Sequence, residues 1–230
     1  MAKSIKPFIL IAFLKVLGSP LFSQCEESFQ TLWGLTDGSP VTVSHANYNL
    51  QNDLLVCGNS NSKGIIVCFN GTSSVRWAKT YNSGNSLFFK KIISMSDGGI
   101  AVAGTAIDNG ASVVVIIRLD GTGNILWTKR LYDISSVPGL TNQFLLVHGL
   151  GETPDGGLAI CGRKTYKRVD GNFNYRIYTI QLSAAGNVNW TREDTQGNDD
   201  EPYGLLMDQG AIVIIGTTYS PVSGIRYGFL

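Results

Sequence analysis

The chain has 230 residues, with 18 lysine and arginine side chains against 17 aspartate and glutamate side chains and a formal net charge of +1. This near-neutral balance excludes the large positive field typical of proteins that bind nucleic acid or an anionic membrane surface. Only 15% of the residues are charged and 27 are glycine, which favours many short strands joined by tight turns.

Residues 1–24 have the organisation of a secretory signal peptide. Two lysines precede the apolar stretch 8–14, and small residues follow as far as Gln24. The apolar stretch is shorter than the ~20 residues that a membrane-spanning helix needs. We therefore expect the mature chain, residues 25–230, to be secreted or held at the cell surface, with no transmembrane segment once the signal peptide is removed.

The mature chain repeats one phrase with a period of roughly 50 residues, which indicates a repeat architecture. The phrase is an Asp-Gly-Gly turn, an apolar run that ends on glycine, and a later turn that leads to tryptophan. Its clearest copies are 97–104 with 119–127, and 155–162 with 182–190. Short apolar runs bounded by glycine and aspartate predict buried strands, and four such runs end at Gly58, Gly104, Gly162 and Gly216.

Each glycine-ended run is followed by a polar loop, a second β-rich run, a tight turn and a strand that carries tryptophan. Asp or Asn at the start of these turns and Gly near their end predict the side-chain bonds and the positive φ that such turns need. Four strands per unit, with no helical periodicity, predict an all-β fold of four-stranded antiparallel blades, a β-propeller with about four blades. We expect Trp77, Trp127 and Trp190 to pack blade against blade. A β-sandwich is the alternative, but it does not require strands to recur in phase.

The phase of the repeat gives the unit boundaries and exposes both ends of the chain. An orphan fourth strand at 28–35 precedes the first unit, and the last run reaches Leu230 inside a third strand. Either the orphan strand completes the last unit and closes a four-bladed ring, or the reading frame is truncated and further blades follow. We favour truncation, because a finished protein rarely stops inside a strand. The predicted blades are 41–80, 87–131, 144–192 and 203–230.

Three cysteines fall in the repeats. Cys57 and Cys68 flank the predicted turn 61–64 symmetrically, so we expect them to face each other across a hairpin. A disulfide and a pair of small buried core residues are both compatible with that placement. Cys161 occupies the same repeat position as Cys57, where other copies have Ala103 and Ile215, which favours a packing role.

The copies at 97–127 and 155–190 resemble a family of bacterial secreted β-propeller repeats, whose blades carry Asp-Gly-Gly, a glycine-ended strand and a Gly-Asn-x-x-Trp hairpin. The resemblance covers most of residues 26–230. It implies association with type IX secretion and with adhesion-like modules, and it brings no catalytic residues and no cofactor. The hairpin 119–127 is also similar to the blades of quinoprotein dehydrogenases, but it is one residue shorter and the chain has no adjacent cysteines.

No residue pattern in the chain predicts catalysis, a metal site or a cofactor. The two histidines, His45 and His148, have no Gly-x-Ser-x-Gly nucleophile elbow to serve, and no His/Cys cluster has zinc spacing. The Asp-Gly-Gly turns offer too few oxygen ligands for calcium. We therefore expect a non-catalytic binding or scaffolding module. The alternative is the propeller part of an exported enzyme, a quinoprotein-like dehydrogenase or a hydrolase whose catalytic part is missing.

The candidate site lies in the loops. In a propeller the joins between first and second strands and between third and fourth strands share one edge, and here they are short and constant. We expect the joins on the opposite edge to be long and different in every copy, the usual arrangement for recognising a protein or glycan partner. Solvated loops without a partner are the alternative. The candidate partner-binding residues are Tyr132, Lys164, Tyr166, Lys167, Arg168, Phe173, Asp194, Asp199, Asp200, Glu201 and Tyr203.

Overall fold

The computed structural model describes residues 40–71, 74–82, 86–132, 144–167, 173–194, 199–220 and 225–229. These residues form strands, turns and no helix, and every sheet pairing between neighbouring strands is antiparallel. The prediction of an all-β fold is confirmed. The predicted signal peptide, the orphan strand at 28–35 and Leu230 lie outside the described residues.

The strands form four sheets, and each sheet is a meander in chain order. The first sheet contains β1 (Thr42–Tyr48), β2 (Leu54–Ser60), β3 (Lys63–Phe69) and β4 (Val75–Tyr81). The second contains β5 (Leu87–Ser94), β6 (Ile100–Asp108), β7 (Ala111–Leu119) and β8 (Ile125–Leu131). The third contains β9 (Phe144–Glu152), β10 (Leu158–Lys167), β11 (Phe173–Leu182) and β12 (Val188–Asp194). The fourth contains three described strands, β13 (Glu201–Asp208), β14 (Ala211–Ser220) and β15 (Ile225–Phe229).

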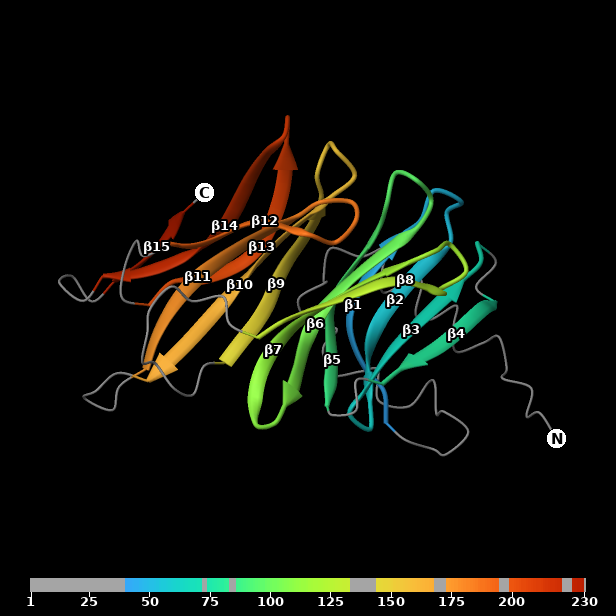
Figure 1. Cartoon of the computed structure of the whole chain (residues 1–230), viewed down its shortest axis with the longest axis horizontal. Coiled ribbons are helices and arrows are strands. Elements are labelled where there is room, and N and C mark those ends of the chain that lie inside the picture. Colours follow the sequence, from blue (N-terminus) through green and yellow to red (C-terminus); the bar gives the residue numbers. More distant parts are fainter. Residues whose placement is uncertain are drawn as a thin grey trace.

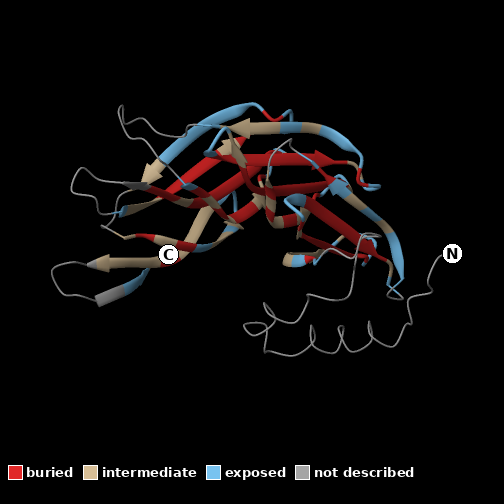
Figure 2. Cartoon of the chain, turned by 90° about the horizontal axis from the view of Figure 1, so that it is seen from below, coloured by how far each residue is buried: buried red, intermediate tan, exposed pale blue. Residues whose placement is uncertain are grey.

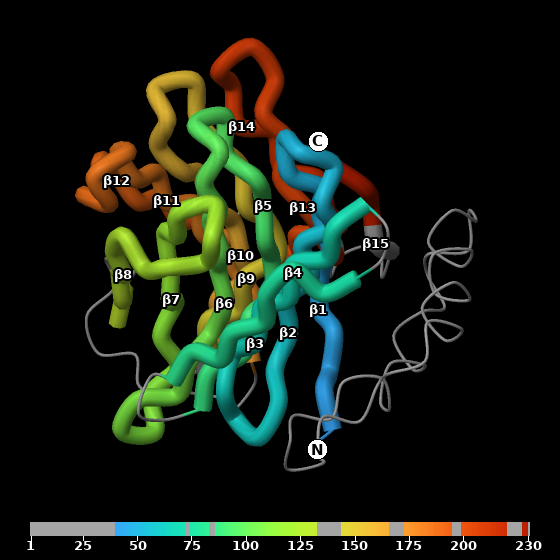
Figure 3. The backbone as a smooth tube through the Cα atoms, turned by 90° about the vertical axis from the view of Figure 1, so that its right-hand side faces the viewer, coloured from blue at the N-terminus to red at the C-terminus, as the bar shows by residue number. Residues whose placement is uncertain are grey.

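The sheets follow one another in space as they do in the chain. Figure 1 shows them in a row, from the first sheet at the right to the fourth at the left. Their first strands lie together, because β1 contacts β5, β5 contacts β9, and β9 contacts β13. In the side view of Figure 3, β8 and β12 lie on one side of the molecule and β1 and β13 on the other. Each sheet therefore meets the next mainly through its first strand.

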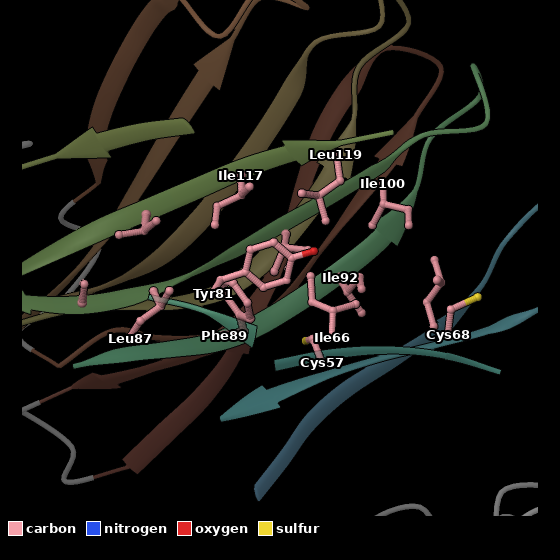
Figure 4. Close-up of a cluster of buried hydrophobic side chains, with 14 of the residues drawn as sticks. Cys57, Ile66, Cys68, Tyr81, Leu87, Phe89, Ile92, Ile100, Ile117 and Leu119 are labelled. Carbon is pink, nitrogen blue, oxygen red and sulfur yellow. The ribbon is translucent and has the colours of Figure 1, made fainter. Parts of the chain in front are cut away.

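The second sheet is buried on both faces, which explains its nearly continuous apolar sequence. In β7, Val113, Val115 and Ile117 pack toward the first sheet, and the alternating Val114 and Ile116 pack toward the third. In Figure 2 the buried segments lie in the middle of the molecule. Figure 4 shows the side chains that fill the space between the first two sheets. Each fully buried side chain of this size contributes about 1.5–3 kcal/mol of transfer free energy. This apolar burial is what holds the sheets together.

The constant turns have the chemistry that their sequence predicts. The Asp97 carboxylate accepts a hydrogen bond from the Gly99 N–H at 2.9 Å, and Gly98 adopts a φ of +83°. The Asp120 carboxylate accepts bonds from the backbone N–H groups of Thr122 and Asn124, at 2.8 and 2.9 Å. These bonds hold the pKa of Asp120 well below its usual range. Aspartate fixes each turn, and glycine supplies its left-handed residue.

The glycine that ends each apolar run has a different purpose, because the first strand of every sheet bulges opposite it. The register of each first strand skips one residue beside the glycine, so two residues face one. An added Cβ at any of these glycines would lie 1.9–2.4 Å from a carbonyl oxygen of the first strand. Only glycine leaves room for that close approach. The glycines are Gly58, Gly104, Gly162 and Gly216, and the skipped residues are Ser44, Lys90, His148 and Tyr203.

Two of the repeated tryptophans pack one sheet on the next, as predicted. The Trp77 ring lies against Gly123, and the Trp127 ring lies against Gly186, in the turn between the third and fourth strands of the following sheet. The Trp127 Nε1–H also donates a hydrogen bond to the Ala184 carbonyl at 3.1 Å. Trp190, in the third sheet, is 39% exposed.

The prediction that Cys57 and Cys68 face each other is wrong. The turn between β2 and β3 is two residues long, so Cys57 pairs with Ile66 and Cys68 pairs with Leu55. Both thiols are free and buried in the core between the first two sheets. Cys161 is also free and buried, and it takes the same place beside the bulge as Cys57 does in the first sheet.

Candidate binding surface

We use the name loop edge for the end of the sheets that carries the joins between second and third strands and the connections from sheet to sheet. In the first two sheets this end is the lower one in Figure 1. The prediction that all these joins are long is wrong for those sheets, because Asn61–Ser62 and Asn109–Gly110 are two-residue turns with positive φ at both positions. Asn-Gly between apolar runs is a strong signal for such a turn, and it was present in the sequence.

Lys164 does not belong to an exposed basic patch. It lies inside β10, its side chain is completely buried, and its ammonium contacts Glu193 Oε1 at 2.7 Å. Arg176 approaches the other oxygen of the same carboxylate at 3.6 Å. The three groups come from β10, β11 and β12 and tie these strands together. Lys164 is therefore a structural residue of the third sheet.

The predicted acidic loop also serves the structure. Asp200 is completely buried. The Asp200 N–H donates to the Tyr175 carbonyl at 3.4 Å, and the Tyr219 N–H donates to the Asp199 carbonyl at 3.2 Å. Residues 199 and 200 thus join β11 of the third sheet to β14 of the fourth. Asp200 cannot offer its carboxylate to a partner at the surface.

The other two predicted carboxylates are paired with arginines. Glu201 accepts a hydrogen bond from the Arg163 guanidinium at 2.8 Å, and Asp194 accepts one from Arg192 at 2.7 Å. The Arg163 guanidinium also lies over the Tyr175 ring, 4.8 Å from its centroid. Among the described residues, no group of three or more His, Cys, Asp or Glu side chains has an arrangement that could hold a metal ion.

Three predicted aromatic residues are exposed. Tyr132, Phe173 and Tyr203 are 56%, 49% and 56% exposed. The Tyr132 hydroxyl donates to Asp108 at 2.8 Å, which fixes the ring beside the end of β6. The Tyr203 hydroxyl lies 3.1 Å from Thr217 Oγ1. Among the candidate side chains that the structure describes, these three rings are the exposed ones.

The backbone places Tyr166 and Lys167 at the end of β10, where they pair with Asn174 and Phe173. Arg168 lies outside the described residues.

A pocket that the sequence did not reveal opens on the loop edge between the first and second sheets. It has a volume of about 470 Å³. Two backbone hydrogen bonds fix its wall, from the Leu87 N–H to the Ser62 carbonyl at 2.7 Å and from the Ile107 N–H to the Ser86 carbonyl at 2.9 Å. Its lining is mostly polar and consists of Asn61, Ser62, Lys63, Asn82, Ser86, Ile107, Asn109 and Gly110.

Burial favours the uncharged form of the buried histidines and cysteines. Burial lowers the pKa of His45 to about 4, with Lys91 acting in the same direction, and the His45 Nδ1 lies 3.1 Å from the Ile92 carbonyl oxygen. Burial lowers the pKa of His148 to about 4 as well. The Cys57 and Cys161 thiols have pKa values raised by burial to about 12, so neither is a thiolate at neutral pH.

Comparisons with known proteins add little. No family model and no curated protein matches the chain. Among solved structures, the chain is similar to MPT-4, a mannose phosphorylase from Leishmania mexicana, solved in complex with phosphate ion. That match has a TM-score of 0.38 and 10% sequence identity, and it covers 84% of this chain and 83% of the other. A similarity this weak does not bear on the function. Within the described residues, no helix is long and apolar enough to cross a membrane.

Proposed function

We propose that the chain is a secreted or cell-surface β-propeller module that binds a glycan through the loop edge and has no catalytic activity of its own. The propeller assignment is supported by four successive antiparallel meanders whose first strands lie side by side. Export is supported by the signal-peptide pattern of residues 1–24. The resemblance to bacterial secreted repeats associated with type IX secretion agrees with both.

The observation that carries the proposal is the pocket between the first and second sheets. Its volume of about 470 Å³ falls within the range of about 300–1,000 Å³ that is usual for small-molecule sites. Asparagine amides, serine groups and the Lys63 ammonium supply both donors and acceptors, and this mixed set matches the hydroxyl groups of a sugar. An apolar ligand would cover these polar groups without offering them hydrogen bonds, at a cost in free energy.

The test is a glycan array with the full-length secreted protein, followed by calorimetric titration of the best binder. Lys63→Ala and Asn82→Ala should each weaken binding about tenfold, the effect of losing one or two hydrogen bonds. Lys129→Ala removes the same charge from β8, outside the pocket lining, and should leave binding unchanged.

Two outcomes would overturn the proposal. The first is an array without a specific glycan, and the second is a glycan whose affinity is the same in all three variants. Turnover in a panel of hydrolase and quinone-dependent dehydrogenase assays would instead favour the propeller part of an exported enzyme.

A further inference from the structure

The fourth sheet has an apolar face that no other described sheet covers. This sheet lies at one end of the row of four (Figure 1). Its inner face packs on the third sheet, where Leu205 lies so close to Gly149 that an added Cβ on the glycine would be 2.5 Å from the Leu205 Cβ. Its other side, which we call the outward face, carries Leu206 and Val213, which pair directly with each other, and Gly204 and Ile215, which pair one step along.

The same positions are buried in the other three sheets. The first and third residues before the glycine that ends each apolar run are at most 1% exposed in those sheets. In the fourth sheet the same two positions are Ile215 and Val213, and both are half-buried. Leu206, beside them on β13, is 57% exposed. The outward face therefore has the composition of a contact between sheets. The buried pairs are Leu55 and Cys57, Ala101 and Ala103, and Ala159 and Cys161.

The glycine next to the bulge shows where a covering strand is missing. Gly149 in β9 and Gly204 in β13 each come directly after the residue that the register skips. An added Cβ at Gly149 meets Leu205 of the next sheet, whereas an added Cβ at Gly204 meets nothing within 4 Å. Leu205 is the second residue after the skipped residue of its own strand. The space beside Gly204 is therefore the place for the equivalent residue of another first strand.

The first sheet carries the matching side chains. In β5 and β9, the residues three and one before the skipped residue and two after it pack on the preceding sheet, and they are Leu87, Phe89 and Ile92, and Leu145, Val147 and Leu150. The equivalent residues of the first sheet are Val41, Val43 and Ala46. Within the described part of the chain, the cluster to which they belong contains residues of the first sheet only. Val43 and Ala46 are half-buried.

We propose that copies of this chain associate head to tail, with β1 of one copy packed on the outward face of the fourth sheet of the next. Ala46 of one copy then lies beside Gly204 of the other, as Leu205 lies beside Gly149 within one chain. The contact continues the packing that joins successive sheets, and it removes apolar surface of both copies from water. A head-to-tail contact closes into a ring when the rotation between copies allows it.

The first test measures the molar mass of the full-length secreted protein by light scattering over a wide range of concentration. The mass should rise from that of one chain to that of two or more. Leu206→Asn should weaken association at least about tenfold, as expected when one apolar side chain no longer gains from burial. Leu126→Asn is the matched control, because Leu126 is 59% exposed on the fourth strand β8, and it should leave association unchanged.

The second test mixes two variants that carry their changes on opposite ends of the chain. Ala46→Glu places a charge on β1 and should also weaken association, whereas Ala78→Glu on β4 should not. An equal mixture of the Ala46→Glu and Leu206→Asn variants should regain pairs of chains at a concentration where each variant alone is monomeric. The mixture provides one intact contact, between the fourth sheet of the first variant and β1 of the second. An outward face that binds itself would give no such recovery.

The third test uses the unmodified protein and remains decisive if the variants do not fold. Amide hydrogen exchange should slow in β1 and β13 together as the protein concentration rises, with β8 unchanged. A mass of one chain at every concentration, a mixture without recovery, or protection confined to β13 would each overturn the proposal. The proposed glycan pocket lies between the first and second sheets, so its test can fail independently.

Discussion

The first strands of these sheets share a backbone feature, whereas the fourth strands share a side chain. Along the first strands the backbone repeats, since a bulge faces a glycine in all four sheets, while the residue at the bulge changes each time. Along the fourth strands the side chain repeats, as Trp77, Trp127 and Trp190. A repeated side chain fixes how sheets pack. A repeated bulge with a different residue in each sheet preserves the packing of the strands, while the polar group at that position differs from sheet to sheet.

The largest expected effect comes from filling the space at a bulge. Gly104→Ala places a Cβ 2.2 Å from the Phe88 carbonyl oxygen, inside the most buried sheet. The clash is with backbone, which cannot rotate away, so the free energy of unfolding should fall by roughly 3–5 kcal/mol. Thermal unfolding should show a drop of about 10 °C or more, or no folded protein.

Gly204→Ala is the control for that variant. Gly204 also lies in a first strand beside a bulge, but an added Cβ there meets nothing within 4 Å. Its melting temperature should stay within a few degrees of the unmodified protein, the usual range for a change without a steric cost. Equal losses in the two variants would show that the close approach of the carbonyl oxygen does not explain the need for glycine.

A smaller effect is expected where the sheets meet through tryptophan. Trp127→Ala removes the ring from Gly186 and the hydrogen bond to Ala184, and should lower the free energy of unfolding by about 2–3 kcal/mol. Trp127→Phe keeps a ring and should recover part of this loss. Trp190→Ala, at a more exposed position of the same repeat, should cost under about 1 kcal/mol. If chemical denaturation gives the same loss for both alanine variants, the contact between sheets does not explain the repeated tryptophan.

Stability should also depend on pH. The pKa of each histidine is about 4 in the folded protein, against an ordinary value of 6.5, so the unfolded chain binds protons first as the pH falls. Stability should therefore be complete above pH 6.5 and decline as the pH falls through 4. The chain has only these two histidines, and carboxylates with a lowered pKa such as Asp120 destabilise the protein only below about pH 5, so melting temperatures measured from about pH 7.5 to 5 report mainly on the histidines. His148→Gln should flatten part of the decline, and a flat profile over that range in the unmodified protein would contradict the assignment.

Much of the candidate binding surface could not be predicted from the sequence. Lys164 lies in a polar stretch of sequence that resembles a loop, but β10 extends to Lys167. The partner of Lys164, Glu193, is 29 residues away in the chain. Asp200 likewise looked like an exposed acid, and the contact between the third and fourth sheets buries it. In both cases a distant strand decides whether the charge faces water or protein.

The alignment of the strands explains the other differences between prediction and structure. The symmetric spacing of Cys57 and Cys68 suggested a facing pair, but a two-residue turn shifts the pairing by two positions along one strand. The pocket lined by Lys63 and Asn109 has no sequence signature, because its lining comes from two sheets and from the connection between them. Asn109–Gly110 was the exception, since that dipeptide alone indicates the two-residue turn that forms part of the lining.

The sequence by itself determined the class of structure and its repeat, because strand periodicity and turn chemistry are local properties. Asp97, Asp120 and their glycines act within a few residues of chain, so their roles could be predicted. The sequence also showed that glycine recurs at the end of each apolar run. Only the tertiary structure gave the reason, a carbonyl oxygen of the neighbouring strand pressed against the glycine by a bulge. Bulges, buried ion pairs and pockets depend on how strands align, and that alignment is set by packing between residues far apart in the chain.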